Sequence, residues 1–453
     1  MSVDSSVAMR GVQQRSGLGD RTAEVPNAGA YVASLAGLVA SLALTLLALL
    51  DLRRGFLFVQ YAPRSTYYAF NPWHVVMLAA GIAGLIVSHR ALRRLEPRMV
   101  AMPRHVKGLT FIVLALLVAD LFAYRGVPAA RSIAAGRINV DWLGAFGVTD
   151  WWRPFAQATS YLLNVWHATM IGVLMSGLAL TILPRYLEPY FVRPGFTGSL
   201  VGALFALPQP FCSCCSSVMA PSFVRRGAST NFLLSFVVGA PMLNVTTLFL
   251  AVALLPAPFA LVRIVAGMVV TVLVTYVVAR AADRWDAPNP AAGEAAARAG
   301  SWRRIAAFYE RLFEVEGIVG GGVDTPSDLV ARWLRASGRI ALILVPTLWG
   351  WSVVAAVVFQ ALPSAFGNNL PSVVAAAVGG TFFMISTWSE IPMALRLIES
   401  GWSGPAAALL VVLPAVSLPC MVVLGGTLQR FRMVALLAAA VILVGIAAGA
   451  LFL

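Results

Sequence analysis

Residues 433–453 read MVALLAAAVILVGIAAGALFL and contain no charged side chain. A helix needs about 20 apolar residues to cross the roughly 30 Å hydrocarbon core of a bilayer, so this stretch predicts a transmembrane helix. Comparable stretches recur along the chain, and we expect nine spans, at 29–50, 73–89, 106–124, 156–183, 231–255, 258–280, 339–362, 404–425 and 433–453. The sequence therefore predicts an all-α integral membrane protein that crosses the bilayer many times.

The overall composition agrees with this prediction. Hydrophobic residues make up 59% of the chain and charged residues only 11%, a balance typical of a protein surrounded by lipid. The formal net charge is +14, but the arginines lie in short segments between apolar stretches, where they determine membrane topology. We therefore expect the chain to lie in a lipid bilayer, the cell inner (plasma) membrane, and to have no nucleic-acid partner.

Other sequence features exclude further classes of protein. Residues 1–28 are polar and lack the apolar stretch and cleavage site of a signal peptide, so we expect a disordered cytoplasmic tail. Four cysteines, three of them within residues 212–215, do not organise a disulfide scaffold. The only lysine is Lys107, so there is no Gly-x-x-x-x-Gly-Lys phosphate loop. We expect neither ATP hydrolysis nor a cofactor.

Two further apolar segments, 196–224 and 371–396, are interrupted by proline, glycine and polar residues. Broken backbone at membrane depth must be hydrogen-bonded by protein or water. If both segments are re-entrant, Arg225, Arg226 and the loop 281–338 lie in the cytoplasm, whereas two full spans would place them outside, against the positive-inside bias. We therefore expect two broken, re-entrant segments and a cytoplasmic N-terminus.

The predicted spans form two similar units, 156–280 and 339–453, each with three spans and one broken segment. An odd number of crossings makes such units inverted copies of each other, and broken helices that meet near the midplane are a recurring transporter plan. The units share short sequence matches: Gly227-Ala-Ser229, Pro241 and Asn244 in the first, and Gly401-Trp-Ser403, Pro414 and Ser417 in the second. We therefore predict an inverted internal repeat.

This pattern divides the chain into five parts. The tail 1–28 precedes an N-terminal membrane module of three helices at 29–155, to which the sequence assigns no function. The first repeat, 156–280, and the second, 339–453, are separated by a cytoplasmic loop at 281–338.

The most informative run for chemistry is Pro208-Gln-Pro-Phe-Cys-Ser-Cys-Cys-Ser-Ser217. Thiolates are soft ligands that prefer thiophilic partners such as arsenic(III) species, mercury or copper(I). Cysteines beside a proline break can present sulfur and freed backbone groups to a cavity. The alternative interpretation is structural, because buried cysteine often serves as a small apolar residue that lets helices pack closely.

Polar residues inside predicted membrane segments are the other candidates. A carboxylate such as Glu390 is costly in lipid unless it faces water or a partner. In the functional interpretation Glu390 contacts substrate or couples protons. In the structural interpretation it accepts hydrogen bonds from backbone donors at the break or from Trp388. Asn244, beside Pro241, either completes a midplane site or bonds between helices. His167 either relays protons or packs as a satisfied buried side chain.

Several motifs together resemble the predicted-permease family that includes organoarsenical efflux permeases. They are Pro210-Phe-Cys-Ser-Cys214, Arg225-Arg-Gly-Ala-Ser229, Gly239-Ala-Pro-Met-Leu-Asn244, Glu390-Ile-Pro392, Gly401 and Leu413-Pro-Ala-Val-Ser-Leu-Pro419, and they cover about 156–453. The resemblance implies a membrane permease with Cys212, Ser213 and Cys214 near its transport path. The family usually has glycine after the second cysteine and a proline soon after, where this chain has Cys215 and, later, Pro221.

The function we expect is therefore permeation of a small solute, including efflux of thiophilic species such as trivalent organoarsenicals or soft metals, and not an enzymatic reaction. The candidate substrate-binding residues are Pro210, Cys212, Ser213, Cys214, Cys215, Pro241, Asn244, Ser386, Trp388, Ser389, Glu390 and Pro392. Cys212, Cys214 and Cys215 are also the candidate ligands of a soft metal or metalloid. The alternatives are a membrane thiol oxidoreductase, although Cys-x-x-Cys is its usual spacing, and a non-transporting subunit of a membrane complex.

Overall fold

The computed structural model describes residues 27–55, 57, 68, 70–96, 102–134, 151–191, 194–208, 213, 216–217, 220, 223–224, 227–285, 323–361, 367–382, 390–428 and 430–453. Within these ranges all regular structure is helical, and nine helical stretches are long and apolar enough to cross a membrane. Each overlaps one of the nine predicted spans, so the all-α membrane fold is confirmed. Most of the expected loop 281–338 and most of the cysteine run lie outside the described residues.

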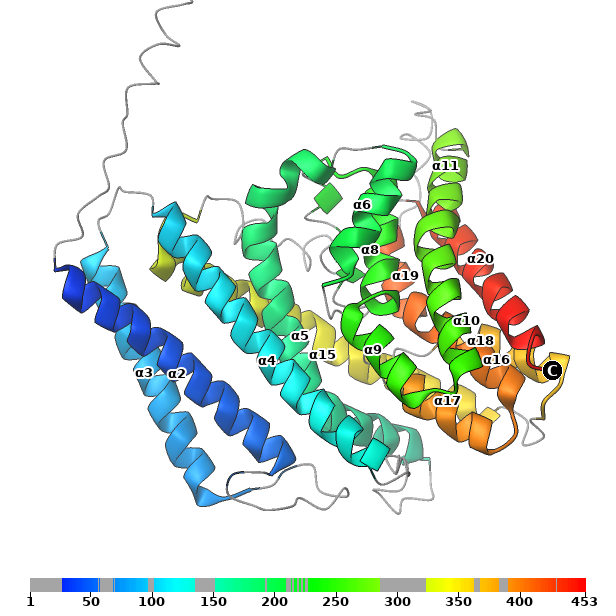
Figure 1. Cartoon of the computed structure of the whole chain (residues 1–453), viewed down its shortest axis with the longest axis horizontal. Helices are drawn as coiled ribbons and strands as arrows, with labels where there is room; N and C mark the ends of the chain where they lie inside the picture. Colours follow the sequence, from blue (N-terminus) through cyan, green and yellow to red (C-terminus); the bar gives the residue numbers. More distant parts are fainter. Residues whose placement is uncertain are drawn as a thin grey trace, which may run out of the picture.

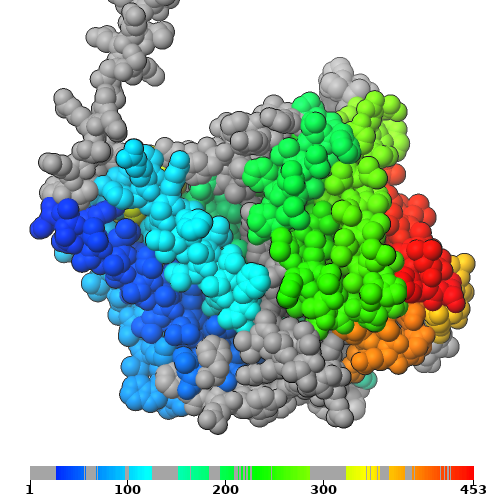
Figure 2. Space-filling model, viewed as in Figure 1, coloured from blue at the N-terminus to red at the C-terminus, as the bar shows by residue number. Residues whose placement is uncertain are grey.

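Helices α2 (Ala28–Arg54) and α3 (Pro72–Leu95) form a hairpin that packs against α4 (Pro103–Ala134). Gly81 lets α2 and α3 approach closely, because a Cβ there would overlap the side chain of Thr45. Asn71 begins α3 by accepting a hydrogen bond from Trp73 N. On the face shown in Figure 2, α2–α4 and the helices α6–α11 form two separate masses.

Two long helices, α5 (Arg153–Phe191) and α15 (Pro326–Ala361), pack against each other, and α15 crosses the view of Figure 1 from behind α4 toward α9 and α17. They are antiparallel, since the indole of Trp333 donates to Leu174 O at 2.7 Å and that of Trp349 donates to Thr159 Oγ1 at 3.1 Å. Helix α15 begins at Pro326, so its first turns fall within the segment expected to be a loop. Helices α2, α3 and α4 contact the rest of the molecule through α5 and α15.

The remaining helices form two consecutive sets. The first set comprises α6 (Phe196–Ala206), α8 (Thr230–Met242), α9 (Val245–Leu254), α10 (Ala257–Met268), the π-helix η1 (Val269–Val274) and α11 (Thr275–Trp285). The second comprises α16 (Leu370–Gly380), α17 (Glu390–Glu399), α18 (Ser403–Ala415), α19 (Leu418–Leu428) and α20 (Phe431–Ala450). Helices α10, η1 and α11 follow one another without interruption.

The expected spans 231–255 and 404–425 are each broken into two helices. The first is interrupted after Met242 and the second after Ala415, and each upstream helix carries a proline, Pro241 or Pro414, in its last turn. Proline removes a backbone donor and ends or kinks a helix. Sequence analysis assigned breaks to other segments and missed these two.

The two breaks are built alike. Helices α8 and α18 each have 13 residues and follow a glycine with positive φ, 78° at Gly227 and 80° at Gly401. At the first break Val245 N donates to Leu207 O at 3.0 Å, and at the second Leu418 N donates to Thr381 O at 2.7 Å. The pair α8–α9 runs in the opposite direction to α18–α19 (Figure 1). These matches agree with the prediction of an inverted repeat, which we retain as a prediction.

Candidate functional site

The break between α8 and α9 begins with a backbone carbonyl that Pro241 leaves without its helical partner. The carbonyl of Val237 would accept from the amide of residue 241, but proline has no N–H. Ser216 Oγ lies 3.0 Å from Val237 O and donates to it instead, and it also lies 3.0 Å from Ser213 O. Ser213, Ser216 and Ser217 are all buried. Ser216, a described serine of the cysteine run, thus contacts α8 just over one turn before its end.

Asn244 joins the two sides of the break. Its Nδ2 donates to Ala240 O at 2.9 Å, on the α8 side. Its Oδ1 accepts from Thr247 N at 2.8 Å and from Thr247 Oγ1 at 2.9 Å, which caps the first turn of α9. Asn244 and Thr247 are buried. These hydrogen bonds link α8 to α9 within one broken span, and the role of Asn244 in binding substrate stays a prediction.

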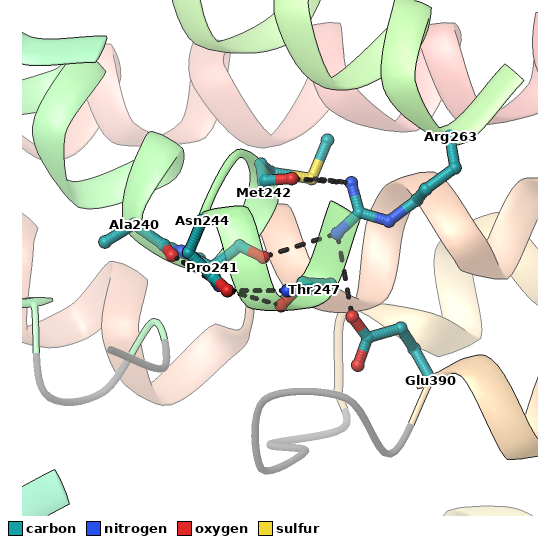
Figure 3. Close-up of polar contacts among 7 residues, drawn as sticks. All are labelled: Ala240, Pro241, Met242, Asn244, Thr247, Arg263 and Glu390. Atoms are coloured by element: carbon teal, nitrogen blue, oxygen red, sulfur yellow. Dashed lines mark hydrogen bonds and ion pairs between the residues drawn. The ribbon is translucent and has the colours of Figure 1, made fainter. Parts of the chain in front are cut away.

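Arg263, on α10, occupies the end of α8 and is fully buried. Its Nη1 donates to Met242 O at 3.1 Å, and its Nη2 donates to Pro241 O at 3.3 Å (Figure 3). The last carbonyls of a helix carry partial negative charge and have no intrahelical donor, so a guanidinium suits this place. Gly267, one turn along α10, lies beside the guanidinium and the end of α8, since a Cβ there would lie 3.2 Å from Leu243 Cδ2 and 3.4 Å from Arg263 Nη1.

Glu390 is the first residue of α17 and is buried next to the same guanidinium. Its Oε1 lies 3.6 Å from Arg263 Nη2, which is an ion pair (Figure 3). Arg263 therefore joins two sequence-predicted site pieces, the Pro241–Asn244 break and Glu390, which come from different halves of the chain. A charge pair away from water is strongly coupled, because the effective dielectric constant there is low.

Sequence analysis missed Arg263, the residue that holds this cluster together. The signal was present, since an arginine inside a predicted span is as costly in lipid as Glu390. Glu390, Asn244 and His167 were named as polar candidates inside membrane segments, but Arg263, in the span 258–280, was not.

The other predicted site residues are not tested by the structure. Ser213 is described and buried, and Pro392 falls within α17. Pro210, Cys212, Cys214, Cys215, Ser386, Trp388 and Ser389 lie outside the described residues. Within the described ranges, no group of three or more histidine, cysteine or acidic residues is arranged to hold a metal ion. The soft-metal site at the cysteines therefore stays a prediction.

Comparison with known proteins identifies the family. Residues 154–452 match a family described as "Predicted permease". The chain belongs to this predicted permease family. The match includes the α8–α9 break, Arg263 and Glu390, whereas α2, α3 and α4 precede it. The protein is accordingly a multi-pass membrane permease, which confirms the family resemblance and the general function expected from the sequence.

Two relatives of the permease show how widely its family extends. The UPF0718 protein YraQ of Escherichia coli (strain K12) is 31% identical over 280 residues, which cover 60% of this chain and 73% of the relative. The UPF0718 protein MJ0584 of Methanocaldococcus jannaschii is 22% identical over 311 residues, which cover 58% of this chain and 85% of the relative. No solved structure matches the permease.

Proposed function

We propose that the permease exports thiophilic solutes, with trivalent organoarsenicals and soft metal ions as the substrate class, out of the cytoplasm across the inner membrane. It does so as a transporter and not as an enzyme. The cysteines Cys212, Cys214 and Cys215 supply the soft ligands, and the α8–α9 break with Arg263 and Glu390 forms the polar part of the path.

One contact carries this proposal. Ser216 Oγ lies 3.0 Å from Val237 O, the carbonyl that Pro241 leaves free, so the residues next to the cysteines are held against the broken helix. The same helix ends at the carbonyls that Arg263 contacts. A solute bound by the cysteine run would therefore lie close to buried charges that span both halves of the permease.

The test is flux of methylarsenite, a trivalent organoarsenical, into inside-out proteoliposomes that contain the full-length chain. We expect Cys212→Ser and Cys214→Ser each to reduce the initial rate at least about tenfold, the effect of losing roughly 1.4 kcal/mol of interaction in the rate-limiting step. Cys215→Ser reports whether the third sulfur contributes.

Cys420→Ser is the matched control, because Cys420 is a buried thiol in α19 that contacts Ser417 and lies outside the proposed site. Its rate should equal that of the wild type. Unchanged flux in both the Cys212 and Cys214 variants would refute the sulfur mechanism. A reversible disulfide among these three cysteines, detected by mass spectrometry in a protein without flux, would favour a thiol oxidoreductase instead.

A further inference from the structure

Two buried aspartate–histidine pairs lie outside the site described above. Asp51 on α2 pairs with His74 on α3, and Asp120 on α4 pairs with His167 on α5, each with 2.6 Å between a carboxylate oxygen and Nε2. All four side chains are buried. Ionisable residues inside membrane spans are costly and mark functional sites unless their partners account for them. The two pairs differ in what the remaining atoms contact.

In the Asp51–His74 pair, the remaining side-chain atoms accept hydrogen bonds from backbone amides. Asp51 Oδ1 accepts from Leu57 N at 2.7 Å, and His74 Nδ1 accepts from Asn71 N at 2.9 Å. Because Nδ1 accepts a backbone hydrogen bond, the ring carries its proton on Nε2 and donates it to Asp51. A second proton on Nδ1 would break the bond to Asn71. This pair fastens the end of α2 to the start of α3 and has a structural role.

The Asp120–His167 pair has no comparable backbone hydrogen bonds in the part of the chain that the structure describes. Within the described residues, Asp120 Oδ2 and His167 Nδ1 are buried and have no hydrogen-bond partner. Buried polar atoms are nearly always hydrogen-bonded, and each exception calls for an explanation such as a bound ion or a chemical role. Both atoms carry free lone pairs, so each is a place where a proton can bind.

Two side chains from the N-terminal helices lie next to the pair. The ring of Tyr124, on α4, stacks on the imidazole of His167 with centroids 4.7 Å apart, and the guanidinium of Arg54, on α2, lies 4.2 Å from the centre of the Tyr124 ring. A positive charge therefore lies close to the Asp120–His167 pair.

Helix α15 also packs against α5. Its contacts to Leu174 and Thr159 set the register of the two antiparallel helices. In this register Asp328, Arg332 and Arg335 lie nearer the level of Leu174, whereas Arg339 lies near the level of His167 but has an exposed side chain. Tyr124 and Arg54 are thus the titratable and charged side chains that face the pair from α4 and α2.

We propose that the Asp120–His167 pair is a proton-binding site at the contact between α4 and α5. The added proton comes from water, binds His167 Nδ1 or Asp120 Oδ2, and returns to water, so no other reactant is needed. Because Asp120 lies before the residues that match the family and His167 lies within them, the site joins the added helices to the permease core. Coupling of this proton to solute movement rests on the proposed transport function.

The proton site is tested without any solute, by infrared titration of the full-length protein in lipid vesicles. We expect a band of the pair, from the Asp120 carboxyl or the His167 imidazolium, that appears as the pH falls, is absent from Asp120→Asn and is shifted in frequency or lost in His167→Gln. Asp51→Asn is the matched control and should keep the band. A titration of Asp120→Asn identical to that of the wild type would overturn the proposal. Should Asp120→Asn fail to fold, nitrogen-15 spectra of labelled histidines decide: the shifts of His167, assigned through His167→Gln, must change on lowering the pH, and unchanged shifts would overturn the proposal.

Coupling is tested by methylarsenite flux with and without a pH gradient. We expect the gradient to change the wild-type rate severalfold, and the rate of Asp120→Asn to be independent of it, while Asp51→Asn follows the wild type. A full gradient effect in Asp120→Asn would overturn the coupling. Absence of methylarsenite flux in the wild type would refute the proposed substrate, and the titration alone would then decide the proton site.

Discussion

At the scale of single residues, the buried pair of Arg263 and Glu390 gives the sharpest prediction. Removing one partner leaves the other charge buried alone, which costs about 3–5 kcal/mol of stability. We expect Arg263→Met and Glu390→Gln each to lower the unfolding temperature of the detergent-purified permease strongly. The double variant should lose less than the sum of the two, because neither charge then remains unpaired.

The matched control is an exposed ion pair of the same permease. Arg430 Nη1 lies 2.9 Å from Asp283 Oδ1, and both side chains are partly exposed. Pairs of this kind contribute only about 0.2–1 kcal/mol, so Arg430→Met should barely change the unfolding temperature. Two results would contradict the assignment of a strongly coupled buried pair. One is that the decreases in unfolding temperature of Arg263→Met and Glu390→Gln add up in the double variant. The other is that these decreases are no larger than that of Arg430→Met.

The residues of the site were predictable only where the sequence interrupts an apolar run. Pro241, Asn244 and Glu390 stand out because each breaks the local pattern, and the structure brings their regions together. Arg263 escaped notice because its role depends on which carbonyls and which carboxylate surround it. Pro241 and Glu390 are far from it in the sequence, and no local spacing encodes that proximity.

At the scale of elements, the join between α8 and α9 depends on Asn244. We expect Asn244→Ala to lower the unfolding temperature and the transport rate together, because it removes both the cap of α9, worth about 0.5–2 kcal/mol, and the bond to Ala240. The unfolding temperature and transport rate of Asn244→Asp should lie between those of Asn244→Ala and the wild type. Aspartate keeps the cap of α9 but loses the hydrogen bond that Asn244 donates to Ala240. The unfolding temperature and the rate of methylarsenite flux are both measured on the same preparation of each variant.

An ordinary helix cap serves as the control for this effect. Asn369 caps α16 by accepting from Ser372 N at 2.9 Å. Asn369→Ala should lower stability by a similar amount and leave the flux per folded protein unchanged. Equal flux per folded protein in Asn244→Ala and the wild type would show that the α8–α9 join does not take part in transport.

The spans themselves were predictable because length and hydropathy are local properties, and all nine appear where the sequence indicates. The breaks inside the spans 231–255 and 404–425 were not, because one proline near a helix end fits a kink as well as an interruption. The start of α15 at Pro326 was missed for another reason. Its charged first turns resemble a loop in composition, and their contacts with α5 and with Glu96 join residues that are far apart in the sequence.

At the scale of the whole molecule, an inverted repeat places corresponding loops on opposite sides of the membrane. We expect Ala228→Cys, next to Gly227, to react with a membrane-impermeant maleimide only in inside-out vesicles. Ser400→Cys, next to Gly401, should react in intact cells. Both positions precede matching helices, α8 and α18. Labelling of both from the same side would rule out the inverted arrangement.

The account as a whole depends on the Arg263–Glu390 pair at the α8–α9 break being part of the path of the solute. The most direct measurement is methylarsenite flux through the double variant Arg263→Met, Glu390→Gln, after its unfolding temperature has shown that it is folded. We predict a folded permease whose flux falls at least about tenfold, a loss equivalent to roughly 1.4 kcal/mol. A folded double variant that carries methylarsenite as fast as the wild type would contradict the account.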